Sequence, residues 1–194
     1  MTEVTTVHLR DEELLGVGLE IKNDQISFNS FLKKIYQQID GKYPKFYKFD
    51  TCSKMTYLAA FLLLENMVTH MDQLSIIFMS TEGSDLIDQK HLATITDREH
   101  YFPSPANFVY TLPNIAIGEL CIRHKIKQEG IFFIDEEFDQ RKSFSRISIL
   151  FNKSNIQCAL AVWATPSQKT LTMSLIPKAT FSEKTIDKIF KKII

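Results

Sequence analysis

The sequence lacks the features that mark a nucleic-acid-binding or membrane protein. Its 194 residues carry 23 basic and 23 acidic side chains, so the formal net charge is zero and there is no basic footprint for nucleic acid. The longest apolar run, residues 57–64, is far too short to span a bilayer. The first residues show no basic flank followed by an apolar stretch, which argues against a signal peptide. We therefore expect a cytoplasmic protein that neither binds nucleic acid nor inserts into a membrane.

Cysteine and histidine are few and scattered. Cys52, Cys121 and Cys158 form an odd, widely spaced set without a Cys-x-x-Cys pair, which fits reduced thiols rather than a disulfide framework. The five histidines show no paired spacing, so the sequence predicts no metal site, and we expect no cofactor. They are His8, His70, His91, His100 and His124.

Glycine and proline are also scarce, with six of each, and the chain contains neither an internal repeat nor a low-complexity linker. Hydrophobic residues make up 44% of the chain, which at this length is enough for one domain with its own core. We predict a single domain over residues 1–194.

Strands and helices alternate along most of the chain. Apolar runs and period-2 alternation predict strands over 4–10, 15–21, 74–79, 131–134, 156–163 and 170–176. Helical spacing predicts helices over 28–39, 51–71, 85–95, 113–127, 139–152 and 183–193, with Thr51 or Ser53 and Ser182 as caps. This order favours an α/β layered fold with a mostly parallel sheet, made mixed by an antiparallel last pair of strands.

The segment from Tyr101 to Gly118 joins a proline-marked loop to an apolar helix through Thr-Leu-Pro-Asn. Pro113 suits a first helical position because its missing N–H costs nothing there. Ile115, Ile122 and Ile126 are expected on one face of the following helix, and Glu119, Arg123 and Lys127 on another. We expect Thr111 and Asn114 to hold the loop by hydrogen bonds from side chain to backbone.

The stretch Phe102–Lys127 resembles the one that leads to the active-site cysteine of β-ketoacyl synthases. Tyr-Lys-Phe-Asp at 47–50, Ser-Lys at 53–54 and the strand Asn155–Ala164 add weaker support. The resemblance implies a thiolase-like half with about five strands and helices on both faces. It also implies that the family's second half, which supplies two catalytic histidines, is absent.

The nucleophile of this family sits at a tight turn that opens a helix, where the helix N-terminus and backbone N–H groups stabilise the thiolate and the oxyanion. The corresponding turn here, residues 134–139, contains no cysteine. The resemblance implies that Glu137 replaces the nucleophile, with Glu136 and Phe138 as the alignment margin. A carboxylate cannot accept an acyl group from a thioester as a thiolate does. Clustered acids at a helix start are most often caps.

By analogy with the chain-length factor, an inactive relative, we expect a non-catalytic ketosynthase-like subunit. It would pair with a full-length ketosynthase or with itself in bacterial fatty-acid-like or aryl-polyene/flexirubin-type biosynthesis. Phe108 approximately matches a position that contributes to the partner's acyl channel, with core packing as the alternative. Arg123 and His124 are candidates for an acyl carrier protein or its phosphate, or else a solvated helix face. A half-fold should expose an apolar surface, which the helix 183–193 could seal.

Two other interpretations stay open. The chain could be an acyl-thioester hydrolase or acyltransferase that uses Cys121 as a nucleophile, or Glu137 with Glu136 and Asp139 as general acid and base. Cys121 lies between Leu120 and Ile122 in an apolar helix, so a small buried hydrophobe is the favoured interpretation of this residue. The chain could also be a module that binds an acyl carrier protein.

Overall fold

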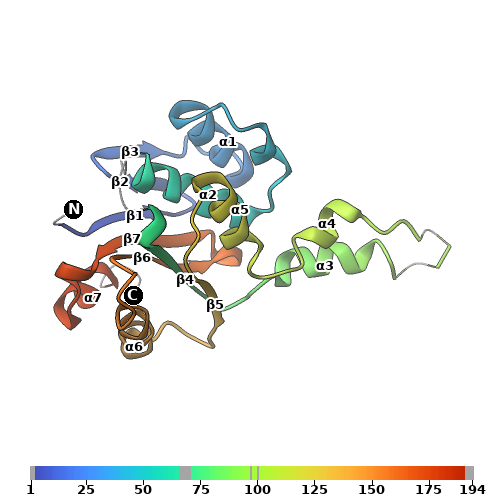
Figure 1. Cartoon of the computed structure of the whole chain (residues 1–194). Helices are drawn as coiled ribbons and strands as arrows, with labels where there is room; N and C mark the ends of the chain where they lie inside the picture. Colours follow the sequence, from blue (N-terminus) through green and yellow to red (C-terminus); the bar gives the residue numbers. More distant parts are fainter. Residues whose placement is uncertain (1–2, 66–70, 97, 100, 191–194) are drawn as a thin grey trace.

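The computed structural model describes residues 3–65, 71–96, 98–99 and 101–190, and a seven-stranded sheet lies at its centre with helices on both faces (Figure 1). The strand order is β3-β2-β1-β7-β6-β4-β5. The strands are β1 Thr5–Leu9, β2 Glu13–Gly16, β3 Leu19–Lys22, β4 Leu74–Ser80, β5 Gly130–Ile134, β6 Cys158–Thr165 and β7 Thr170–Pro177.

The sheet differs from the predicted one in strand number and in pairing. It has seven strands rather than about five, and only β4–β5 and β4–β6 pair in parallel. The other four pairs are antiparallel, so the prediction of a mostly parallel sheet was wrong. The predicted antiparallel pairing of the last two strands is confirmed, with a 3-10 turn at Pro166–Gln168 between them.

The N-terminal meander explains part of this difference. Leu15, Val17, Leu19 and Ile21 alternate like one strand in the sequence, but the chain reverses between Gly16 and Leu19. Val17 has φ 55° and Gly18 φ 73°, and a Cβ on Gly16 would stand 2.6 Å from the carbonyl oxygen of Thr6. Gly16 and Gly18 allow the positive φ angles of this turn, and they are the signal of the reversal in the sequence. The apolar alternation on both sides of the turn favours a single strand instead.

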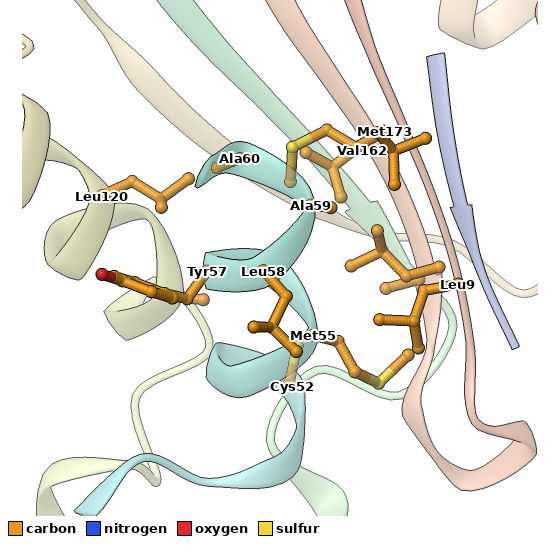
Figure 2. Packing of buried hydrophobic residues seen from close by; sticks show 14 of the residues in the cluster. Leu9, Cys52, Met55, Tyr57, Leu58, Ala59, Ala60, Leu120, Val162 and Met173 are labelled. Atoms are coloured by element: carbon orange, nitrogen blue, oxygen red, sulfur yellow. The ribbon is translucent and has the colours of Figure 1, made fainter. Parts of the chain in front are cut away.

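Helices α1 (Phe28–Ile39), α2 (Thr51–Leu64) and α5 (Ile115–His124) cover the first face of the sheet. Figure 2 shows α2 between α5 and the sheet, with Leu58 and Met55 among buried neighbours. Twelve of its fourteen residues are buried, which confirms the predicted central helix. Its N-cap is Asp50 rather than Thr51 or Ser53. Residues 66–70 of the predicted extension, His70 included, lie outside the described residues.

Helices α6 (Gln140–Phe151) and α7 (Glu183–Phe190) cover the second face. Ile147 of α6 packs in one buried cluster with Ile186, Ile189 and Phe190 of α7. The hydroxyl of Ser182 accepts a hydrogen bond from the Thr185 backbone N–H at 3.2 Å, which confirms the predicted cap. The final helix therefore lies on apolar side chains of the sheet. Residues 191–194 lie outside the described ranges.

The helix after Thr-Leu-Pro-Asn begins later and ends earlier than the spacing predicts. Its first residue is Ile115, after the N-cap Asn114, rather than Pro113, and it ends where Lys125 takes a left-handed conformation with φ 56°. Ile126 is therefore outside the helix, and Ile122 is exposed, whereas Glu119 is buried. The predicted faces were wrong, because the buried face of the helix is formed by Ala116, Ile117, Glu119 and Leu120.

Helices α3 (Asp85–Ala93) and α4 (Pro105–Val109) pack on each other and extend outward from the sheet on the side of edge strand β5 (Figure 1). We call residues 85–112 the arm; residues 97 and 100 within it lie outside the described residues. No helix in the described part of the chain is long and apolar enough to cross a bilayer.

Candidate functional site

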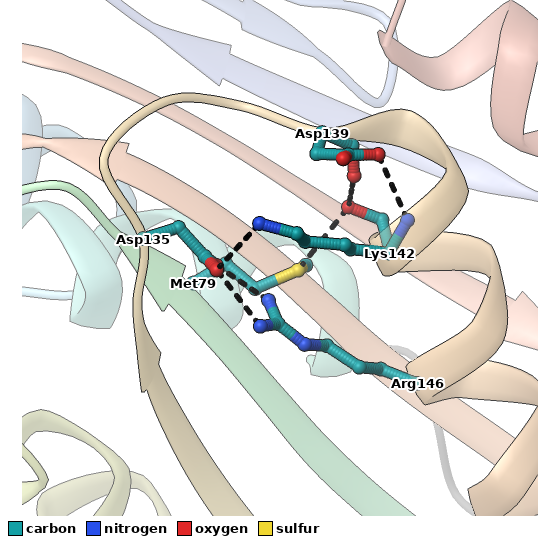
Figure 3. A network of polar contacts seen from close by, with 6 residues as sticks. Met79, Asp135, Asp139, Lys142 and Arg146 are labelled. Atoms are coloured by element: carbon teal, nitrogen blue, oxygen red, sulfur yellow. Dashed lines mark hydrogen bonds and ion pairs between the residues drawn. The ribbon is translucent and has the colours of Figure 1, made fainter.

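The turn between β5 and α6, residues 135–139, is the one that the motif resemblance aligns with the nucleophile of β-ketoacyl synthases. Asp135 follows β5 directly, and its carboxylate accepts two hydrogen bonds from Arg146 of α6, at 2.5 and 2.8 Å (Figure 3). The Asp135 side chain is 8% exposed, and hydrogen bonding to Arg146 holds the pKa of Asp135 below its ordinary value. The Arg146 guanidinium also lies 3.9 Å from the ring centre of Phe133. These contacts hold the turn against α6.

Asp139 caps the helix that the turn opens. Its carboxylate accepts a hydrogen bond from the Lys142 backbone N–H at 2.9 Å, and this bond lowers the pKa of Asp139. The Ser143 hydroxyl donates to the Asp139 carbonyl oxygen at 2.8 Å and contacts the sulfur of Met79 (Figure 3). Asp139 is thus the N-cap of α6, and its carboxylate satisfies one of the free backbone N–H groups in the first turn of this helix.

Glu136, Glu137 and Phe138 between these two aspartates have different surroundings. Both glutamates are exposed and border a cavity of about 550 Å³. Phe138 also borders this cavity, and its ring packs against those of Trp163 and Phe190, with ring centres 5.1 and 4.8 Å away. None of the described residues that line the cavity is a cysteine or a histidine. The described lining of the cavity therefore offers the carboxylates of the turn and threonine hydroxyl groups from other elements, and no cysteine or histidine that could act as nucleophile and base.

The three cysteines lie on other elements. Cys52 is buried in the first turn of α2, Cys121 is half-buried on α5, and Cys158 is buried at the start of β6. Burial raises the pKa of all three thiols. At Cys52 the nearby Asp50 carboxylate raises the pKa further. The lowering of the thiol pKa that a helix N-terminus can cause is therefore outweighed at Cys52. The structure places no activated thiol among these three residues.

Arg123 and His124, the predicted anion-binding candidates, differ in exposure and in contacts. The Arg123 guanidinium lies 4.0 Å from the buried Asp40 carboxylate and 5.1 Å from the ring centre of Tyr43. The Nε2 atom of His124 is buried and has no hydrogen-bond partner. Burial lowers the pKa of His124 to about 4, so its ring is neutral near pH 7. The two residues do not form a cationic pair that faces solvent.

The remaining candidates lie on or beside the arm. Phe108 is 61% exposed, and its ring packs against His91 at 5.6 Å. Thr111 donates from its hydroxyl to the Phe108 carbonyl oxygen at 2.8 Å, which confirms the predicted loop bond. Asn114 is the N-cap of α5, but its side chain makes no capping hydrogen bond, so its predicted bond is not formed. His100 lies outside the described residues.

Comparison with known proteins finds a similarity of structure but no similarity of sequence. No protein-family model matches the chain, and no curated protein matches it. A solved structure of the ketosynthase ApeO in complex with its chain length factor ApeC, from Xenorhabdus doucetiae, contains a chain of similar fold. The TM-score is 0.54 and the identity 13%, over 90% of this chain and 76% of the matched one. The chain therefore has a thiolase-like fold, as the motif resemblance predicted.

The shares of the two chains that are aligned also give the ratio of their lengths. Because the same aligned region is 90% of this chain and 76% of the matched chain, the matched chain is about 1.2 times as long. The likeness is thus to a chain of similar length.

Sequence reasoning missed the partner of Asp135. Asp135 and Arg146 are eleven positions apart, across the start of a helix, and this spacing has no diagnostic pattern. An isolated arginine on the inner face of an amphipathic helix was the only available signal.

Proposed function

We propose that this chain is a non-catalytic ketosynthase-like subunit that binds a ketosynthase in bacterial fatty-acid-like or aryl-polyene-type biosynthesis. The thiolase-like fold supports the family assignment. The β5–α6 turn supports the lack of condensing chemistry, because it contains an ion-paired aspartate, a capping aspartate and a packed phenylalanine in place of a thiolate.

The observation that carries the pairing is the apolar surface of the arm. Of the thirteen exposed large hydrophobic residues in the described part of the chain, seven belong to the arm. They are Leu86, Leu92, Tyr101, Phe102, Phe108, Val109 and Leu112. By contrast, Ile149 is the only such residue on the described parts of α6 and α7. Clustered exposed apolar side chains of this kind mark interaction surfaces rather than ordinary solvated loops.

The edge strand beside the arm extends this surface. β5 is at the end of the sheet and pairs with β4 on one side, so its other side presents backbone N–H and C=O groups for a further strand. Ile134 at the end of β5 is exposed, and its side chain lies beside Gly83, which in turn adjoins Pro113 just after the arm. An open strand edge next to an apolar arm suits a large, mostly apolar subunit interface.

A ketosynthase is the partner that the comparison favours, because the similar chain comes from a complex of a ketosynthase with its chain length factor. The catalytic alternative has less support. Cys121 has a raised pKa, and Glu137 is an exposed carboxylate with no histidine in the lining of its cavity. Arg123 and His124 also give little support to a carrier-binding module, since one lies against Asp40 and the other is neutral.

The test is co-purification with a ketosynthase encoded in the same genome, followed by light scattering on the size-exclusion peak. We expect a one-to-one complex for the natural chain and for Ile149→Ser, the matched control, because Ile149 is equally exposed, at 61%, but lies on α6. The double variant Phe108→Ser with Leu112→Ser should weaken the complex by about tenfold or more, since central apolar anchors dominate interfaces. A homodimer without affinity for any ketosynthase, or equal effects of both variants, would contradict the proposal.

A second measurement addresses the chemistry. After incubation with an acyl thioester, intact-protein mass spectrometry should show no covalent adduct. An adduct that disappears in Cys121→Ala would establish the acyl-transfer alternative instead.

A further inference from the structure

A second cavity, of about 320 Å³, lies between α1, the start of α2 and the arm. We call it the lysine pocket. Its polar lining includes three lysines, one aspartate and two asparagines: Lys48, Lys54, Lys90, Asp50, Asn29 and Asn107. Its volume is at the lower end of the range for pockets that bind small molecules. None of its lining residues belongs to the β5–α6 turn.

Lys54 is the residue that makes this cavity unusual. Its side chain is buried, with 8% exposed, although it projects from the first half of α2. Its ammonium group donates one hydrogen bond, to the Asn29 side-chain oxygen at 2.8 Å. An ammonium has three N–H donors, so a single neutral acceptor leaves the charge without compensation. Burial lowers the pKa of Lys54 and the nearby Lys33 lowers it further, whereas the Asp50 carboxylate raises it without reversing the shift.

The one aspartate in the pocket does not neutralise the lysines. Both carboxylate oxygens of Asp50 accept backbone N–H groups of α2, from Ser53 at 2.9 Å and from Cys52 at 3.3 Å. Within the described part of the chain, none of the three lysines has a carboxylate at ion-pair distance. A buried cation without a counter-ion is costly, and it favours a bound anion.

We propose that the lysine pocket binds a phosphate monoester group. Three lysines and one aspartate give the lining two net positive charges, which match the dianion of a phosphate monoester. The side-chain amide groups of Asn29 and Asn107 and the Thr51 hydroxyl can supply further hydrogen-bond donors to its oxygens. Lys54 is the buried lysine of the lining, and the bound anion would compensate its charge. This assignment does not depend on pairing with a ketosynthase.

The experiment uses the whole chain and measures the affinity of inorganic phosphate by ³¹P nuclear magnetic resonance and calorimetry. We expect saturable binding that weakens as ionic strength rises. Lys54→Met keeps the aliphatic stem and removes the charge, and Lys90→Ala removes an exposed lysine whose loss does not endanger folding. Each should weaken binding by about tenfold or more, since a charge-assisted hydrogen bond is lost. Lys127→Ala, exposed and outside the pocket, is the matched control and should bind as the natural chain does.

Two phosphate esters then distinguish the origin of the ligand. Tighter binding of phosphopantetheine than of ribose 5-phosphate assigns the site to the prosthetic group of a carrier protein, and the reverse order assigns it to a free metabolite. The proposal is overturned if the natural chain fails to bind inorganic phosphate, or if Lys54→Met and Lys90→Ala both bind it as well as Lys127→Ala does. Either result leaves ketosynthase binding by the arm unaffected, because that assay uses different residues.

Discussion

The protonation of His124 gives a sharp test of how the end of α5 is built. Its Nε2 atom is buried without a hydrogen-bond partner, and burial lowers its pKa to about 4, against 6.5 for an unperturbed histidine. The neighbouring Arg123 also disfavours the charged ring, whereas Asp40 opposes this effect. Between these two pKa values the unfolded chain carries a proton that the folded chain does not. The contribution of the neutral His124 ring to the free energy of unfolding is therefore fully present above pH 6.5 and is lost as the pH falls toward 4.

The size of the effect follows from the two pKa values. Lowering the pH from 7 to 5 should reduce the free energy of unfolding by about 2 kcal/mol through this one group. His124→Leu removes the titration, so its free energy of unfolding should fall by correspondingly less over the same interval. Urea denaturation at both pH values gives the comparison, and the contributions of other groups cancel in the difference. The reasoning is refuted if both proteins lose the same stability, or if the His124 ring titrates near pH 6.5 by nuclear magnetic resonance.

Two other predictions concern the turn and the thiols. Arg146→Met should lower the free energy of unfolding by about 2–3 kcal/mol, because it leaves the buried Asp135 carboxylate without its bidentate partner. Arg141→Met, exposed on the same helix, should change it by less than about 0.5 kcal/mol in urea titrations, and equal effects would contradict the ion-pair role. Iodoacetamide should leave Cys52 and Cys158 unmodified in the folded chain, as measured by mass spectrometry. Modification of either residue at the rate of a free thiol would contradict their burial.

Sequence patterns predicted the helices and the buried strands well, because burial imposes its own period on the residues. Most of the twelve buried residues of α2 and of the seven of β4 are apolar, and these apolar runs indicate both elements in the sequence. The pairing was harder to predict, since a strand's hydrophobicity does not reveal its direction. The reversal at Gly16 and Gly18 shows the limit, because its alternating side chains fit either one long strand or two short ones.

The candidate site was predictable only in part. The position of Glu137 at a turn before a helix follows from the motif resemblance, and the structure places it there. The burial of His124 and the charge of the lysine pocket were not predictable, because both depend on elements far apart in the chain. Asn29, Lys54 and Lys90 come from three helices, and nothing in their spacing indicates that they line one cavity.

The packed β5–α6 turn and the exposed apolar arm together favour a role in subunit assembly over a role in catalysis. Phe138 packs against Phe190, so the last helix described, α7, fixes this residue of the turn, while Glu136 and Glu137 stay exposed beside it. Arg146 holds the other side of that turn through Asp135. A nucleophile placed at Glu137 alone would meet neighbouring carboxylates and no base, so a single substitution should not create a ketosynthase. The apolar arm, by contrast, stays exposed at a cost in solvation that a partner would remove.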